Sequence, residues 1–152
     1  ILTYSFRHDA ADLIGRFRAE LLPSSPVMVE KGAVSFRAGN DGHFIVEAEV
    51  DGTRLRFLVD TGATGVVLSP ADARRLGFDL TALSYTQPAQ TANGLVYGAP
   101  VRLRNIRIGT LVVLDIGASV NGTEMKYSLL GMSLLNRLGG YDVRDGILTF
   151  RP

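Results

Sequence analysis

The sequence contains no cysteine, which excludes disulfide bonds and thiolate metal sites. It has two histidines, His8 and His43, and neither lies in a motif with the spacing of metal ligands. We therefore expect no metal and no other cofactor.

The chain also carries little net charge and no long apolar run. Its 16 basic and 15 acidic residues leave a formal charge of +1, and the basic residues form no cluster, so no nucleic-acid partner is expected. No apolar stretch approaches the roughly 20 residues of a transmembrane helix. The first residue is Ile1, so we expect a fragment or processed form, with membrane contact only through an anchor upstream of it.

What is present predicts one globular domain with a separate N-terminal element, because the 152 residues are 46% hydrophobic and 20% charged. Residues 1–26 are interpreted as an amphipathic helix over 6–22 followed by a Pro/Ser linker at 23–26. The apolar residues at helical spacing are Phe6, Ala10, Leu13, Ile14, Phe17, Leu21 and Leu22. This helix either packs on the domain or serves as a docking, pro-segment or anchor-linking element.

Residues 27–152 have the period-two pattern of β-structure. Phe44, Val46, Ala48 and Val50 alternate with polar positions, Asp51-Gly52 predicts a hairpin turn, and the strand returns over 55–59. Asn93-Gly94, Asn121-Gly122 and Asp145-Gly146 are further turn signals between apolar runs. A mostly-β barrel or sandwich is predicted.

Two short helices interrupt the strands. The first is predicted over 70–76, with Ser69 as N-cap, Pro70 at the first helical position and Gly77 after the end. The second is predicted over 132–138 and ends at Gly139-Gly140.

One segment indicates chemistry: an apolar strand over 57–59 runs directly into Asp60-Thr61-Gly62-Ala63. Burying a carboxylate there costs free energy unless it is hydrogen-bonded or functional, and Gly62 allows a tight turn with amide groups close by. An ordinary turn could have the same residues. The context favours a site, because a second apolar strand, the capped helix and Leu129-Leu130-Gly131 all follow.

This arrangement resembles the retropepsin-like aspartic proteases over about residues 40–150, and looks most like their bacterial, often membrane-anchored branch. The resemblance implies a closed acid-protease barrel with two short helices, in addition to the N-terminal helix. It implies that Asp60 is catalytic and that Thr61, Gly62 and Ala63 complete the active-site loop. Thr61 would contact the other chain beneath the catalytic pair, and the Gly62 carbonyl would bind substrate backbone.

The resemblance also assigns roles to two later segments. A flap that covers the substrate would lie within 86–101, and Asn93-Gly94 is typical of a type I′ hairpin tip. Its tip residues would be Ala92, Asn93, Gly94 and Leu95, although an ordinary surface hairpin is the alternative. Leu129, Leu130 and Gly131 would support the active-site loop from behind. The last strand, over 147–150, would pair within the chain or across a dimer.

Aspartic-protease chemistry needs two carboxylates that share a proton, and the chain has one Asp-Thr-Gly. Asp115 lies in a superficially similar segment, but Ile116 lacks the hydroxyl of Thr61 and no comparable helix follows. Two Asp60 side chains meeting at a two-fold axis are the better solution.

The sequence thus predicts a homodimeric aspartic endopeptidase that binds extended peptide in apolar pockets and hydrolyses it with a water held between two Asp60 carboxylates. One alternative is a non-catalytic retropepsin-like dimerisation or peptide-binding module. Another is a monomeric enzyme that pairs Asp60 with Asp115. By resemblance alone, the expected location is periplasmic or anchored to the inner membrane.

Overall fold

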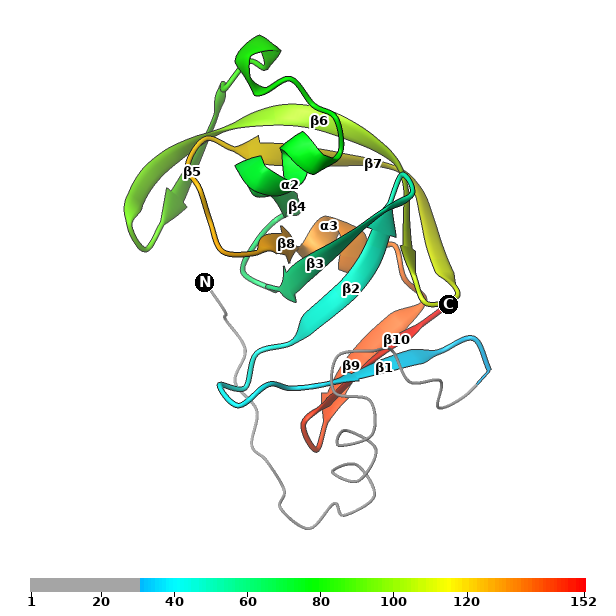
Figure 1. Ribbon diagram of the computed structural model, residues 1–152. Coiled ribbons are helices and arrows are strands. Elements are labelled where there is room, and N and C mark those ends of the chain that lie inside the picture. The colour runs from blue at the N-terminus through cyan, green and yellow to red at the C-terminus, as the bar shows by residue number, and fades with distance from the viewer. Residues whose placement is uncertain (1–30) are drawn as a thin grey trace.

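The structure is a computed structural model that describes residues 31–152 (Figure 1). The predicted helix over 6–22 and the linker at 23–26 lie outside the described residues. The boundary between that element and the protease-like domain therefore stays a prediction. None of the helices within 31–152 is long and apolar enough to cross a membrane.

The described chain is mostly β, as predicted, with short helices between strands. The strands are β1 (Val34–Arg37), β2 (Ile45–Val50), β3 (Thr53–Val59), β4 (Val66–Leu68), β5 (Gln87–Thr91), β6 (Gly94–Ile108), β7 (Leu111–Asn121), β8 (Ser128–Leu130), β9 (Gly140–Arg144) and β10 (Ile147–Arg151). The helices are α2 (Pro70–Arg75), the 3-10 turn η1 (Leu80–Ala82) and α3 (Met132–Leu135).

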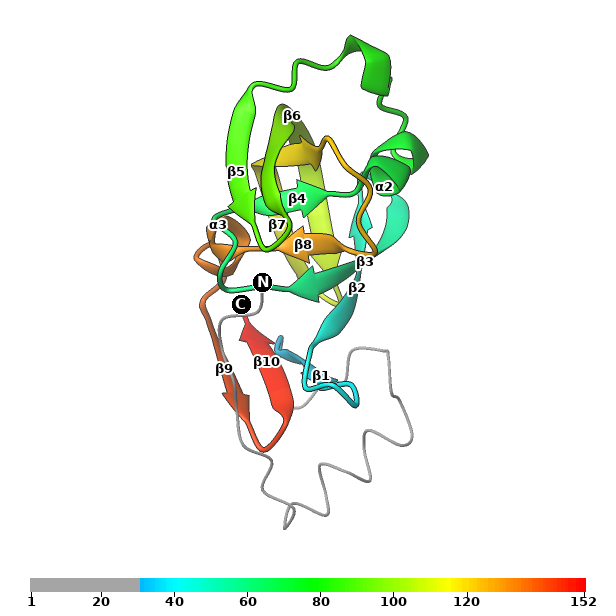
Figure 2. The same cartoon turned by 90° about the vertical axis from the view of Figure 1, so that its left-hand side faces the viewer.

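Six strands close into a barrel. Neighbouring strands follow the order β2-β3-β8-β4-β7-β6, and β6 pairs back to β2 through Glu49↔Arg107 and Val50↔Ile106. The buried side chains of these strands, including Phe57, Leu103 and Ile106, fill the interior. The predicted closed barrel is confirmed, and Figure 2 shows β5 beside the first part of β6 as a hairpin that extends from it.

A second sheet, β1-β10-β9, lies below the barrel in Figure 1. The last strand pairs within the chain on both sides, with Phe150 opposite Val34 on β1 and Tyr141 on β9. Of the two pairings considered for this strand, the structure contains the one within the chain. The edges of the sheet are therefore β1 and β9.

Two hairpin turns form as their sequences predict. Asp51 and Gly52 have φ of 47° and 88°, and Asp145 and Gly146 have φ of 53° and 75°. Positive φ at both central residues is the requirement of a type I′ turn. Asn121-Gly122 instead ends β7 without a hairpin, since the chain continues to β8, which pairs with β3 and β4.

The type I′ prediction for Asn93-Gly94 is wrong. The β5–β6 hairpin exists, but its turn residues are Ala92 and Asn93, because Thr91 pairs with Gly94. Only Gly94 has positive φ there, at 110°, whereas a type I′ turn needs two successive residues in that region. Gly94 therefore begins β6 instead of completing the turn.

Helix α2 follows its prediction, since the Ser69 side chain accepts a hydrogen bond from Asp72 N and Gly77 follows the end with φ of 93°. Helix α3 is shorter than predicted and ends at Leu135. Beyond it, Arg137 N and Leu138 N donate to Leu134 O and Leu135 O, the tighter spacing of a 3-10 turn. Gly139 N then donates to Arg151 O, which draws the chain into β9.

Candidate active site

Asp60 lies directly after β3 and is only 4% exposed. Strand β3 runs parallel to β8, with Val59 opposite Leu130, and Asp60 N donates to Leu130 O at 3.0 Å. The backbone of β8 therefore fixes where the carboxylate emerges from the barrel wall.

The loop after Asp60 folds back on its carboxylate. Gly62 N donates to Asp60 Oδ1 at 2.8 Å, and Ala63 N donates to Asp60 O at 3.1 Å. A backbone donor at this distance fixes the orientation of the carboxylate. Thr61 is half-buried in this loop, and Gly62 is exposed.

The segment after β8 lies directly behind the loop. Met132 N donates to Ala63 O at 2.9 Å, and Ser133 N donates to Thr64 O at 2.8 Å. A Cβ atom on Gly131 would lie 2.3 Å from Gly65 O and 2.6 Å from Ala63 O, so only glycine fits without a backbone shift.

The two leucines before this glycine differ in burial. Leu130 is fully buried, whereas Leu129 is half-buried and pairs with Leu58 and Val67. The structure thus brings together Asp60, its loop and the Leu-Leu-Gly segment.

Sequence reasoning missed a buried polar network that ties α2 to β8. Ser128 is 0% exposed; its Oγ accepts from Ser69 N at 2.9 Å and donates to Asp72 Oδ2 at 2.6 Å. Asp72 Oδ1 also lies 3.7 Å from Arg75 Nη1. Asp72 is the acidic residue in the first turn of α2, but nothing near Ser128 in the sequence signals this contact.

A cavity of about 800 Å³ opens beyond the loop, between β4, the β5–β6 hairpin and β7. It is lined by Thr64, Gly65, Val66, Val67, Gln87, Pro88, Ala89, Gly98, Pro100, Val101, Arg102, Gly117, Ala118, Ser119 and Asn121. Asp60 does not line it, so the cavity begins beside the site instead of at the carboxylate. Five of these residues are polar, and the other ten are apolar or glycine.

The predicted flap tip lies away from this cavity. Ala92 and Asn93 are exposed, Gly94 is half-buried and Leu95 is 56% exposed, and none of the four lines the cavity. Residues nearer the base of the same hairpin do line it.

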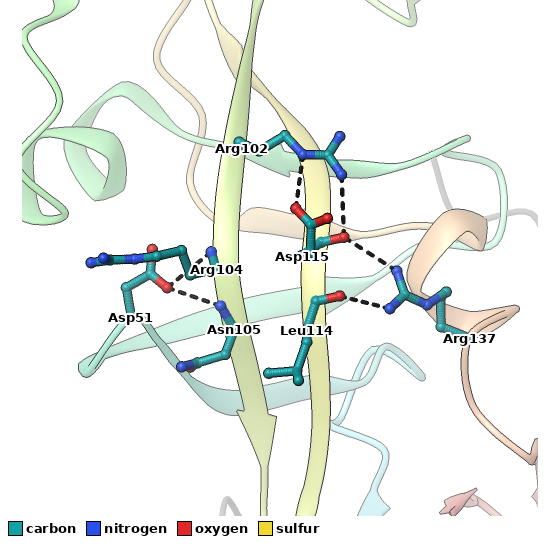
Figure 3. Close-up of polar contacts among 7 residues, drawn as sticks. All are labelled: Asp51, Arg102, Arg104, Asn105, Leu114, Asp115 and Arg137. Atoms are coloured by element: carbon teal, nitrogen blue, oxygen red, sulfur yellow. Dashed lines mark hydrogen bonds and ion pairs between the residues drawn. The ribbon is translucent and has the colours of Figure 1, made fainter.

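Asp115, the alternative partner for Asp60, has an environment of a different kind (Figure 3). Its side chain is 76% exposed, and Arg102 Nε donates to its Oδ1 at 3.0 Å. The hydrogen bond and the positive charge of Arg102 hold the pKa of Asp115 below its ordinary value. Arg102 Nη2 and Arg137 Nη1 donate to the Asp115 carbonyl. An exposed, paired carboxylate is poorly suited to share a proton with the buried Asp60.

Residues 31–152 contain no group of three or more His, Asp or Glu side chains arranged to hold a metal ion. His43 instead pairs with its neighbour Asp41, at 3.5 Å between Nδ1 and Oδ2.

Comparison with known proteins identifies the family to which a chain with this geometry belongs. A family model described as "gag-polyprotein putative aspartyl protease" matches residues 46–137. An uncharacterized protein of Rickettsia prowazekii is 38% identical over 148 residues, which cover 97% of this chain and 64% of that protein. An uncharacterized Sinorhizobium protein is 33% identical over 156 residues, covering 99% of this chain and 67% of its own. The chain thus spans about two thirds of the length of these relatives.

Two solved structures share the architecture. The crystal structure of a retropepsin-like aspartic protease from Rickettsia conorii superposes with a TM-score of 0.73 at 39% identity, covering 78% of this chain and 89% of that one. An EIAV protease in complex with an inhibitor has a TM-score of 0.56 at 21% identity, covering 67% and 93%, and shows likeness of fold alone. The family model, the curated relatives and the Rickettsia conorii structure agree with the Asp60 loop and the closed barrel. The chain therefore belongs to the retropepsin-like aspartic proteases.

Proposed function

We propose that this chain is one half of a homodimeric aspartic endopeptidase. The observation that carries the proposal is the state of Asp60: a 4% exposed carboxylate, held by Gly62 N, with no ion pair within residues 31–152. A buried carboxylate of this kind costs free energy unless a further group compensates it. The Asp60 of a second copy, placed across a two-fold axis, is such a group.

In the proposed dimer the two carboxylates share one proton, because like charges about 3 Å apart cannot both ionise. The ionised carboxylate takes a proton from water, and the protonated one donates a hydrogen bond to the scissile carbonyl. The Gly62 N–H contributes by fixing Oδ1, so that the carboxylate does not have to reorient during the reaction.

We further propose that the substrate is an extended peptide that lies beneath the β5–β6 hairpin, with Ala92 to Leu95 as the moving tip. The exposure of that tip and the cavity at the base of the same hairpin support this assignment. An extended chain there can pair with strand edges through its main chain. A periplasmic or membrane-anchored location is proposed on the family resemblance alone.

The experiment is substitution of Asp60 by Asn with Asp115→Asn as the matched control. The amide that replaces the carboxylate in Asp60→Asn can neither accept the water proton nor share one with its partner. Cleavage of a peptide library should therefore fall by at least about 10²–10⁴-fold. The Asp115→Asn enzyme should keep most of its activity, because Asp115 is exposed and paired with Arg102.

Undiminished cleavage by the Asp60→Asn protein would refute the catalytic assignment. Equal losses of activity in both variants would support the alternative of a monomeric enzyme that pairs Asp60 with Asp115. Peptide binding that is the same in wild type and Asp60→Asn, with no cleavage by either, would indicate a binding module.

A further inference from the structure

We propose that the cavity beside the active-site loop selects an acidic side chain of the substrate and that Arg102 recognises it. This inference rests on the proposed peptidase function and names a specificity-determining residue for it. Arg102 is the only charged residue among the described residues that line the cavity.

The position of Arg102 follows from the pairing of β6 with β7. Arg102 lies opposite Gly117, Pro100 opposite Ser119, and Gly98 opposite Asn121. Alternate residues of a strand share one face, so these six positions form one surface, and all six line the cavity. Arg102 is at one end of that surface, and the polar Ser119 and Asn121 continue it.

The guanidinium is held in place before any ligand binds. Its Nε donates to Asp115 Oδ1 at 3.0 Å and its Nη2 donates to Asp115 O at 3.3 Å, as Figure 3 shows. Because Asp115 fixes the Nε edge, little rotamer freedom of Arg102 is lost on binding a second group.

The other edge of the guanidinium is the one available to a ligand. Within residues 31–152, Nη1 donates to no protein acceptor, and it lies 3.5 Å from where a Cβ on Gly117 would stand. Since Gly117 has no side chain, no side-chain atoms of this residue cover Nη1. Nη1 and the second N–H of Nη2 form a fork that matches the two oxygens of a carboxylate.

The preference for an acidic side chain comes from direct hydrogen bonds to the Nη1 and Nη2 fork and not from long-range electrostatic attraction. Asp115 neutralises much of the charge of Arg102, and the Arg102 side chain is 66% exposed, so solvent screens what remains. A carboxylate gains by direct hydrogen bonds, which an amide of the same shape can match only in part. We therefore expect Glu to be preferred over Gln by about tenfold, the factor that corresponds to roughly 1.4 kcal/mol.

The selected side chain is not one that flanks the cleaved bond. The cavity begins at Thr64 and Gly65, past the loop that holds Asp60, and Asp60 does not line it. The acidic preference should therefore appear at a substrate position further along the peptide.

The test measures kcat/KM for peptide sets that carry Glu, Gln, Lys or Leu at each position outside the cleaved pair. For wild type, one position should favour Glu about tenfold over Gln. Arg102→Gln should abolish that preference, so that the Glu and Gln peptides are cleaved with equal kcat/KM. Arg104→Gln is the matched control, because Arg104 is an exposed arginine of the same strand that does not line the cavity, and it should behave as wild type.

A second variant guards against a folding defect, since Arg102→Gln removes contacts to Asp115. The double exchange Arg102→Glu with Asp115→Arg rebuilds the pair in reverse, and its preference should move from Glu to Lys. The proposal is overturned if Arg102→Gln keeps the Glu preference, if wild type shows none, or if the exchange variant still favours Glu.

Failure of the peptidase proposal has a different signature. If wild type cleaves no peptide, binding of the Glu and Leu peptides is measured by calorimetry. An Arg102-dependent preference for the Glu peptide then supports the cavity assignment without catalysis, and equal affinities refute it.

Discussion

Substitution of Gly131 by Ala should damage both the stability and the activity of the protein. A Cβ atom there would lie 2.3 Å from Gly65 O, 2.6 Å from Ala63 O and 2.8 Å from Gly65 N. All three are backbone atoms of the loop that follows Asp60, so no side-chain rotation relieves the overlap. Overpacking of this kind costs typically about 1–3 kcal/mol, and we expect the upper end.

The activity loss follows from the same displacement. If the loop moves by about 1 Å, the carboxylate loses its productive position, and a misplacement of that size costs about 10²-fold in rate. Urea unfolding at one protein concentration measures the first effect, with a midpoint lowered by roughly 1–2 M. Peptide cleavage by the folded fraction measures the second.

Gly140→Ala is the control, because a Cβ on Gly140 meets nothing within 4 Å. It should change the free energy of unfolding by no more than about 0.5 kcal/mol. If Gly131→Ala is as stable and as active as Gly140→Ala, the packing of this segment against the active-site loop does not matter as described.

Three further predictions concern other contacts. Ser128→Ala removes the hydroxyl that accepts from Ser69 N and donates to the Asp72 carboxylate. It should lower the free energy of unfolding, measured in urea, by about 1–3 kcal/mol. Asp51→Ala should lower the free energy of unfolding by about 1 kcal/mol more than Asp145→Ala does. Both residues have positive φ, but only Asp51 Oδ1 accepts two backbone N–H groups of β6. Equal losses of stability in the two variants would contradict this. The pKa of Asp115, followed by NMR titration, should rise in Arg102→Gln, because the hydrogen bond from Arg102 is the main cause that lowers it. The wild-type pair therefore stabilises the fold above the pKa of the unfolded chain and loses that contribution as the pH falls through the lowered folded value.

The elements that the sequence predicted well are those whose interactions are local. The start of α2 depends on the Ser69 side chain and Asp72 N, three residues apart. The Asp51-Gly52 and Asp145-Gly146 turns depend on the backbone conformation of the turn residues themselves. Such contacts can be identified within a few neighbouring residues.

Two predictions of local structure failed because other parts of the chain decide them. Helix α3 ends at Leu135, and four residues further on Gly139 N donates to Arg151 O, a contact with the last strand. The β5–β6 turn is shifted by one residue relative to Asn93-Gly94, because the register of the hairpin pairs Thr91 with Gly94.

The candidate site also has parts that the local sequence predicts and parts that depend on distant segments of the chain. Asp60 and its loop were identified from the sequence, but the parallel pairing that brings Leu130 O to Asp60 N joins distant segments. Asp115 was noted for its similar segment, but its positive φ of 56° and its hydrogen bond from Arg102 depend on the β6–β7 pairing, which no local pattern contains.

The central claim, that each chain supplies one Asp60 to a shared site, is tested most directly by mixing chains. Wild-type protein is incubated with a ninefold excess of Asp60→Asn chains, and subunit exchange is followed by energy transfer between labelled copies. After exchange, a wild-type chain meets a wild-type partner about one time in ten, so cleavage per wild-type chain should fall to about a tenth. The same excess of Asp115→Asn chains, which keep Asp60, should not reduce it. Unchanged cleavage per wild-type chain after complete exchange with Asp60→Asn would show that one Asp60 suffices and would contradict the account.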